Sequence, residues 1–298
     1  MTAQLARIQP QVRGILLAVV ASACFASMHN MIRYVTAELH PFEVAFFRNL
    51  FGVLVLVPWF LAVGFGSLRT NRIGSHMIRA GFNAMSMLAW FTALSLMPVA
   101  EATSLALSGP VFVTVGAVVF LREKVGLHRW VGVGLALVGA AVIIRPGIET
   151  VGFETWLVLF ATACVSISKL IAKSLSRTDS TATIVAYLTL LMMGITLVPA
   201  LVVWQRPTLT ELSLLALVGS LGTAGHLLFI KAYKLADVSL VEPVMFMRVI
   251  WAALIGFVAF AEFPDIWTWI GAAVIVFGTT YMARREAVRV LHTAETLP

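Results

Sequence analysis

The feature that most constrains this chain is an internal repeat of about half its length. A forward shift of 139 positions superimposes the second quarter of the sequence on the last quarter. The matched pairs at this shift include Ala93 with Ala232, Glu123 with Glu262, Trp130 with Trp269, Gly132 with Gly271 and Gly139 with Gly278. Nearer the N-terminus the shift is 140, which places Ala23-Cys24 on Ala163-Cys164. We therefore expect two equivalent halves, residues 1–147 and residues 148–298.

The balance of apolar and charged residues places these halves in a membrane. The chain is 60% hydrophobic and 12% charged, whereas soluble domains are about 45–50% apolar and about 25% charged. The net charge of +7 is explained by basic loops on one side of a bilayer and does not require a nucleic-acid partner. The two cysteines, Cys24 and Cys164, lie in apolar segments and indicate neither a disulfide framework nor a metal site.

Apolar runs long enough to cross a bilayer of about 30 Å occur ten times along the chain. Backbone hydrogen bonds must be satisfied inside each run, so the expected fold class is all-α, with ten transmembrane helices. The first run has no cleavage signal and is read as a span, not as a signal peptide. The expected spans are residues 14–34, 42–64, 75–96, 100–121, 128–145, 152–173, 183–204, 212–233, 239–260 and 266–283.

Basic residues predict the orientation of the spans. With the N-terminus inside, fifteen of the 21 Lys and Arg residues fall on the cytoplasmic side and three on the outer side, as the positive-inside rule requires. Each half has five spans, an odd number, so the second half is inverted relative to the first. Inverted repeats are typical of secondary transporters, whose substrate site lies between the halves near the membrane midplane. A duplication retained only for packing is the alternative.

The repeated pattern resembles the EamA-type family of the drug/metabolite transporter superfamily. The residues that carry the resemblance are Ala93-Leu94, Pro110, Glu123, Trp130, Gly132 and Gly139 in the first half and Ala232, Glu262, Trp269, Gly271 and Gly278 in the second. The resemblance covers essentially the whole chain and implies ten helices in two five-helix repeats. The run from Ser239 to Gly271 is similar to a bacterial subgroup that includes S-adenosylmethionine carriers, riboflavin carriers and exporters of opine-type metallophores.

Polar and aromatic side chains inside the spans are the candidates for function, because ionisable groups are costly in hydrocarbon. Aromatic walls with a few polar anchors are typical of organic-ligand pockets. The expected substrate-binding residues are Arg248, Arg48, His29, Asn83, Trp90, His226, Tyr187 and Trp251. The expected gating or coupling residues are Lys169, Glu101, Glu242, Pro110 and Pro243.

Each candidate also has a purely structural interpretation. Arg48 could form an ion pair with Glu43 or Glu101, Lys169 could extend to the membrane surface, and the prolines could be static kinks. A histidine within a span is often a hydrogen-bonded packing residue, although its charge can change near physiological pH.

The sequence thus predicts a secondary transporter of the bacterial inner membrane with both termini in the cytoplasm. Its deep cations outnumber its deep anions and favour a carboxylate-bearing substrate, and we expect export of an amino-acid or opine-type metabolite. The alternative is uptake of a cofactor-like molecule such as riboflavin or S-adenosylmethionine. A membrane enzyme or scaffold is the third class, but the sequence offers no metal cluster, no nucleophile–base pair and no soluble domain in its favour. Protons are the candidate coupling ion and a homodimer is the candidate assembly.

Overall fold

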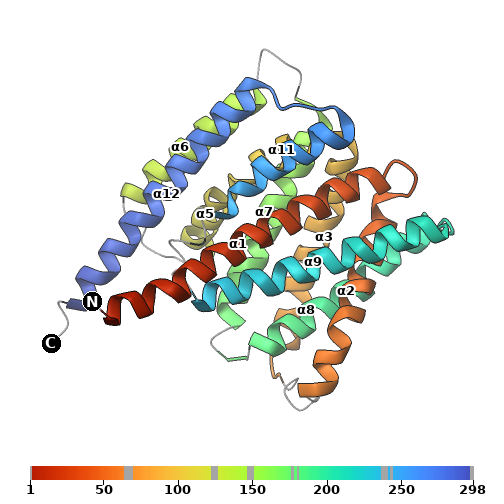
Figure 1. Ribbon diagram of the computed structural model, residues 1–298, viewed down its shortest axis with the longest axis horizontal. Coiled ribbons are helices and arrows are strands. Elements are labelled where there is room, and N and C mark those ends of the chain that lie inside the picture. Colours follow the sequence, from red (N-terminus) through yellow and green to blue (C-terminus); the bar gives the residue numbers. More distant parts are fainter. Residues whose placement is uncertain are drawn as a thin grey trace.

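A computed structural model of the chain describes residues 2–63, 70–121, 127–145, 151–175, 178–179, 181–235, 241 and 244–295. Within these residues every regular element is an α-helix (Figure 1), which confirms the expected fold class. The helices of the first half are α1 (Thr2–Val35), α2 (Pro41–Val63), α3 (Ile73–Leu96), α4 (Val99–Ala106), α5 (Gly109–Leu121) and α6 (Leu127–Ile144). Those of the second half are α7 (Phe153–Leu175), α8 (Thr181–Val202), α9 (Leu209–Leu235), α11 (Met247–Phe260) and α12 (Ile266–Glu295).

The helices form a multi-pass membrane protein. Five described segments are long and apolar enough to cross a bilayer, and three shorter apolar helical segments accompany them. Large apolar side chains such as Val258 and Leu209, 85% and 87% exposed, face outward. That exposure would be unfavourable in water but suits a surface that contacts lipid.

The expected span at residues 100–121 is broken into α4 and α5. Leu107 and Ser108 separate the two helices, and their backbone N–H groups donate to carbonyls only three residues back. Pro110 is the second residue of α5. Proline has no N–H and disfavours helical geometry in the residue before it, so a helix more readily starts at this position than continues through it.

Helices of the two halves interlace instead of forming separate bundles. The most extensive pairings join α1 to α9, α3 to α7 and α6 to α12, and α1 and α9 run side by side in Figure 1. Exchange of the halves converts the α1–α9 pairing into α7–α3, and the α1–α11 pairing into α7–α5. The packing therefore repeats as the sequence does.

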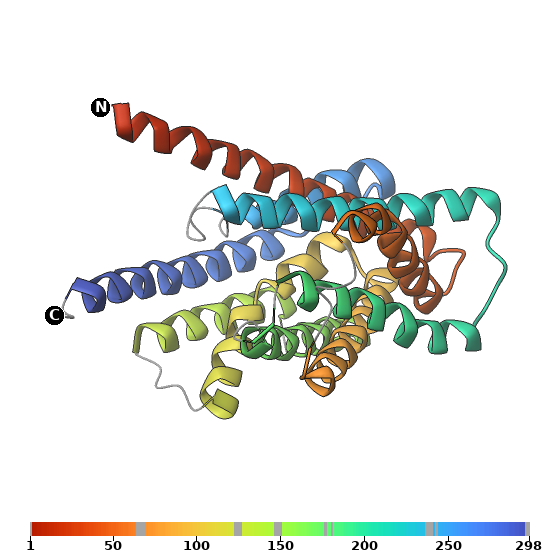
Figure 2. The same ribbon diagram turned by 90° about the horizontal axis from the view of Figure 1, so that it is seen from below.

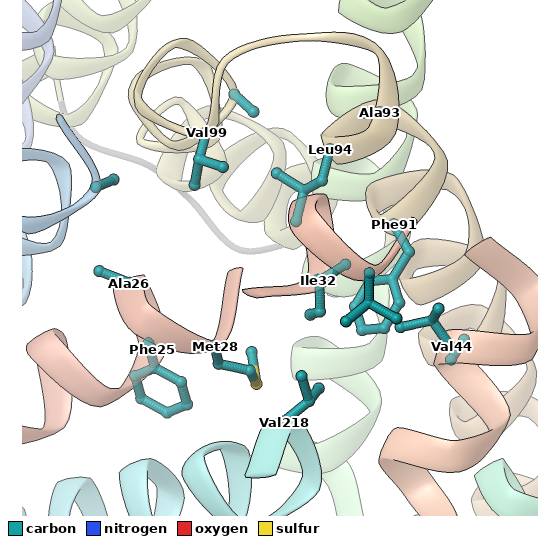
Figure 3. Packing of buried hydrophobic residues seen from close by; sticks show 14 of the residues in the cluster. Phe25, Ala26, Met28, Ile32, Val44, Phe91, Ala93, Leu94, Val99 and Val218 are labelled. Atoms are coloured by element: carbon teal, nitrogen blue, oxygen red, sulfur yellow. The ribbon is translucent and has the colours of Figure 1, made fainter. Parts of the chain in front are cut away.

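The main apolar core lies where α1 crosses the helices around it. Phe25, Met28 and Ile32 of α1 pack with Phe91 of α3 and Val218 of α9 (Figure 3). Because both halves supply this core, close packing of its side chains helps to hold the two repeats together.

The pairing of α6 with α12 is set by glycine. A Cβ atom added at Gly139 would lie 2.6 Å from the carbonyl oxygen of Gly271, and one added at Gly271 would lie 2.5 Å from the carbonyl oxygen of Gly139. Small residues of this kind let membrane helices approach closely. Figure 1 shows α6 and α12 side by side at one edge of the molecule.

The start of α1 and the end of α12 lie at the same end of the molecule, where both helices extend beyond their neighbours (Figure 2). This arrangement agrees with the even number of spans expected from the sequence.

Candidate functional site

One face of α1 presents polar and aromatic side chains to the interior. Ser22, Phe25 and His29 are spaced at three and four residues and therefore share a face of the helix. His29 is 7% exposed and its ring packs edge-on against Trp90 of α3, with ring centroids 5.4 Å apart. Phe25 packs edge-on against His226 of α9 at 5.0 Å. The α1 face therefore connects α3 with α9.

Arg48 of α2 is held in position by a hydrogen bond to the adjacent residue, Asn49. Its Nη1 donates to Asn49 Oδ1 at 3.0 Å, and Asn49 Nδ2 donates to Thr196 Oγ1 of α8 at 3.2 Å. The Arg48 guanidinium lies over Gly222 of α9, where an added Cβ would come within 3.3 Å of its Nη2 and Nε. The glycine thus leaves room for the guanidinium between α2 and α9.

Two residues of α11 complete the cluster. Trp251 Nε1 donates to Ser22 Oγ at 3.2 Å, which fixes the indole against α1. Arg248 lies three residues earlier on α11, and it acts electrostatically on His29 together with Arg48 and His226. Positive and titratable groups from α1, α2, α9 and α11 therefore meet at one place, which we call the central cluster (His29, Arg48, Trp90, His226, Arg248 and Trp251).

The buried polar atoms without a hydrogen-bond partner among the described residues include His29 Nδ1, Arg48 Nε and Trp90 Nε1 of the central cluster. Buried polar groups are nearly always partnered in native proteins, so each such atom needs an explanation. An indole N–H and a guanidinium N–H can only donate. Together they could serve a ligand that carries a carboxylate or another acceptor.

The alternative ion pair of Arg48 with Glu43 does not form. Glu43 is fully buried and one of its carboxylate oxygens accepts a hydrogen bond from the backbone N–H of Gln205 at 3.3 Å. Arg48 instead donates to the Asn49 amide oxygen. Its positive charge is therefore not neutralised by Glu43.

His226 differs from His29 in that the residue is exposed, although its ring packs on Phe25 and interacts electrostatically with Arg48. A polar side chain that is accessible in the middle of a long apolar helix suits a water-filled interior better than a lipid-facing surface.

The structure places three other predicted residues on α8, α7 and α4. Tyr187 of α8 stacks on His76 at the start of α3, with ring centroids 4.8 Å apart. Lys169 of α7 matches His29 in the repeat but its side chain is exposed. Glu101 is in the first turn of α4, where a carboxylate complements the helix dipole.

The remaining predicted residues connect less directly to the central cluster. Asn83 lies two turns before Trp90 on α3 and donates to Met192 Sδ of α8 at 3.0 Å. Pro110 is the second residue of α5, as described above. Glu242 and Pro243 lie outside the residues that the structure describes.

Sequence reasoning overlooked several residues that shape the central cluster, namely Ser22, Phe25 and Met28. They read as ordinary core residues of an apolar span. The signal that could have found Ser22 and Phe25 is their helical spacing from His29.

Comparison with known proteins gives a consistent result over the whole chain. The model of the EamA-like transporter family matches twice, over residues 12–145 and 153–284. The chain is 32% identical over 258 residues to an S-adenosylmethionine uptake transporter of Rickettsia bellii, which covers 86% of this chain and 88% of the relative. It is 30% identical over 279 residues to a riboflavin transporter of Vibrio cholerae, covering 92% and 94% of the two chains.

More distant similarities agree with these. A pseudopaline exporter of Pseudomonas aeruginosa is 25% identical over 279 residues, covering 92% of this chain and 96% of the exporter. A solved crystal structure superimposes with a TM-score of 0.63 and 20% identity, covering 95% of this chain and 98% of the other. At that identity the structural likeness supports the fold alone.

Proposed function

Because the chain belongs to the EamA-like transporter family, a family of drug/metabolite transporters, we propose that it is an uptake carrier for a cofactor-like metabolite in the bacterial inner membrane. S-adenosylmethionine is the first candidate substrate. The observation that carries this choice is the 32% identity to an S-adenosylmethionine uptake transporter over 86% of the chain.

The direction of transport differs from the export expected from the sequence. That expectation rested on the resemblance to a subgroup that includes exporters of opine-type metallophores, whereas the excess of deep cations bears only on the substrate's charge. The relatives of higher identity are uptake carriers of S-adenosylmethionine, and this similarity favours uptake.

The central cluster suits the chemistry of S-adenosylmethionine. Its amino-acid carboxylate matches the Arg48 guanidinium, which can bind a carboxylate with two parallel hydrogen bonds. Trp90 and Trp251 offer aromatic faces for the adenine ring and for the positive sulfonium group. The positive charges of the cluster repel the sulfonium group, so the contact between the carboxylate and Arg48 must offset this repulsion.

Riboflavin is the second candidate, favoured by the 30% identity to a riboflavin transporter over 92% of the chain. Riboflavin has an aromatic ring system but no carboxylate. Contact with the tryptophans would therefore contribute more to its binding than contact with Arg48.

The test is uptake of radiolabelled S-adenosylmethionine into proteoliposomes that contain the purified protein. Competition by unlabelled S-adenosylhomocysteine, decarboxylated S-adenosylmethionine and riboflavin separates the candidates. We expect S-adenosylhomocysteine to compete and the decarboxylated form to compete about 10- to 100-fold less well, as the loss of a charge-assisted hydrogen bond predicts.

The Arg48→Gln variant is expected to lose the distinction between carboxylate-bearing and decarboxylated competitors. Arg206→Gln is the matched control, because it removes the same charge from an exposed loop residue. Uptake of riboflavin without uptake of S-adenosylmethionine would replace the first candidate by the second, and outward transport alone would overturn the proposed direction.

A further inference from the structure

A polar contact joins the two halves at one end of the molecule, away from the central cluster. Asp179, between α7 and α8, accepts a hydrogen bond from Thr70 Oγ1 at 2.6 Å and lies 2.7 Å from His76 Nε2 of α3. The side chains of His76 and Asp179 are 1% and 5% exposed. Little of either side chain is therefore exposed in this structure.

Two arginines strengthen this junction. The Arg72 guanidinium donates to the carbonyl oxygen of Ser174 at 3.0 Å and to its hydroxyl at 3.1 Å. One turn beyond His76, Arg79 donates to the carbonyl oxygen of Ile184 at 3.0 Å. The hydrogen bonds from Thr70 and His76 lower the pKa of Asp179 to about 2, so its carboxylate is charged at neutral pH.

The junction lies on the same helix face as the central cluster. His76, Asn83 and Trp90 recur every seven residues of α3, which is two turns, and so point to one side of the helix. Fourteen residues at 1.5 Å each separate His76 from Trp90 by about 21 Å along α3. The face that lines the central cluster therefore leads to this junction.

Other contacts between the halves lie on the far side of the central cluster. Arg33 of α1, one turn beyond His29, pairs with Glu262 at 2.5 Å and lies over the Phe260 ring. Arg145, after α6, pairs with Asp265 at 2.7 Å. The central cluster thus lies between two sets of polar contacts, each of which joins one half of the chain to the other.

We propose that Thr70, Arg72 and His76 on one side and Ser174 and Asp179 on the other form a gate, the polar latch, that closes one end of the substrate pathway and separates in each transport cycle. Such a contact can open at moderate cost, because water replaces the hydrogen-bond partners of the separated groups. The apolar pairings of α1 with α9 and α6 with α12 lack this property and are expected to persist. The proposal rests on the transporter assignment and does not depend on which substrate is carried.

A reversible cross-link tests whether the latch must open. In a background with Cys24→Ser and Cys164→Ala, Thr70→Cys and Asp179→Cys place two thiols where the side chains now touch. We expect oxidation to abolish transport and dithiothreitol to restore it in the same sample. Each single cysteine variant, treated with the same oxidant, is the control. Transport by the cross-linked protein at the rate of the reduced protein would overturn the proposal.

An accessibility measurement tests the same proposal without a transport assay. Met28 packs beside Arg48 and Gly222, so Met28→Cys in the cysteine-free background reports access to the central cluster. We expect Asp179→Asn to raise labelling by a membrane-impermeant maleimide about tenfold from the latch end, the shift expected when charge-assisted hydrogen bonds are lost. Glu154→Gln, which removes a carboxylate from the other end of α7, should leave the labelling rate unchanged.

The His76→Gln variant is a control for misfolding, because glutamine keeps an N–H donor. We expect its labelling rate to lie between those of the wild type and Asp179→Asn. Unchanged labelling in a folded Asp179→Asn protein would overturn the latch. If no candidate substrate is transported but labelling responds as expected, the proposed substrate fails and the latch stands.

Discussion

Three polar atoms on His29, Arg48 and Trp90 are buried without a partner among the described residues. Satisfying them would require either water or a bound ligand, and leaving them unsatisfied costs stability in the empty protein. A ligand with acceptor atoms recovers this cost on binding. A conservative substitution that removes one of these atoms is therefore expected to weaken binding of the ligand.

Trp90→Phe keeps an aromatic ring on α3 but removes the indole N–H. We expect KM for the transported substrate to rise about 3- to 10-fold with little change in the maximal rate, the effect of one neutral hydrogen bond. Uptake kinetics in proteoliposomes measure both quantities. Trp130→Phe, at a residue that is 46% exposed, is the control and should leave KM unchanged. An unchanged KM in Trp90→Phe would mean that the indole N–H does not contact the substrate.

Asp179 gives a prediction for stability against pH. Its pKa is lowered to about 2 by hydrogen bonds from Thr70 and His76, so it stabilises the folded state at pH values above its unfolded pKa of about 4. This contribution is lost as the pH falls through about 2. Thermal unfolding in detergent gives the difference in midpoint between wild type and Asp179→Asn. This difference should narrow between pH 4 and pH 2, and a difference that widens over this range would contradict the assignment.

The ionisable residues of the central cluster were predictable from a simple rule. His29, Arg48, His226 and Arg248 are ionisable groups within apolar spans, and such groups face a cavity or a partner. Tyr187 and Lys169 satisfy the same rule but lie against His76 and at the surface. Sequence does not show which side of a helix faces inward when both sides are apolar.

The polar latch was not predictable from sequence patterns. His76 and Asp179 are 103 positions apart, and each stands near a loop where a charged residue is usually solvated. Their contact depends on how the ends of α3 and α7 meet, which follows from packing of the whole bundle.

Among the helices, the pairing of α6 with α12 shows how the sequence repeat produces two equivalent contacts between helices. The sequence repeat aligns Gly139 with Gly278 and Gly132 with Gly271. In the structure Gly139 meets Gly271, and the space beside Gly278 is bounded by the backbone of Gly132. The two contacts are equivalents under exchange of the halves, so each glycine is needed for the same close approach.

Gly139→Ala should weaken this pairing. The added Cβ would lie 2.6 Å from a backbone carbonyl, so the helices must separate, at a cost of about 1–3 kcal/mol in free energy of unfolding. Gly134→Ala on the same helix is the matched control, because an added Cβ there meets nothing within 4 Å. It should be neutral or stabilising by about 1 kcal/mol through helix propensity. Equal thermal midpoints for the two variants would contradict the close approach.

Most of the helical architecture could be predicted from apolar run length, since a membrane span has few alternatives. The break between α4 and α5 was harder to predict from the sequence. Pro110 indicated a loosened helix, but run length alone predicted one continuous span. Local backbone geometry decided where the helix restarted.

In the whole molecule, interlacing couples the two ends. The face of α1 carries both His29 and Arg33, and α3 carries both His76 and Trp90, so movement of either helix changes the central cluster and one end together. Inverted repeats of this kind alternate between states open to opposite sides. The polar latch and the Arg33–Glu262 pair should therefore bias one equilibrium in opposite directions.

Asp179→Asn weakens the latch and Glu262→Gln weakens the opposite end. We expect the first variant to increase labelling of Met28→Cys from the latch end and the second to increase it from the opposite end, each by about tenfold. Vesicles of both orientations with an impermeant maleimide distinguish the two directions. Because a two-state equilibrium responds only to the difference between the states, the double variant should return toward the wild-type ratio. If both changes raised labelling from the same end, or if the double variant were more accessible from both ends than either single variant, the ends would open independently and the molecule would not alternate as a unit.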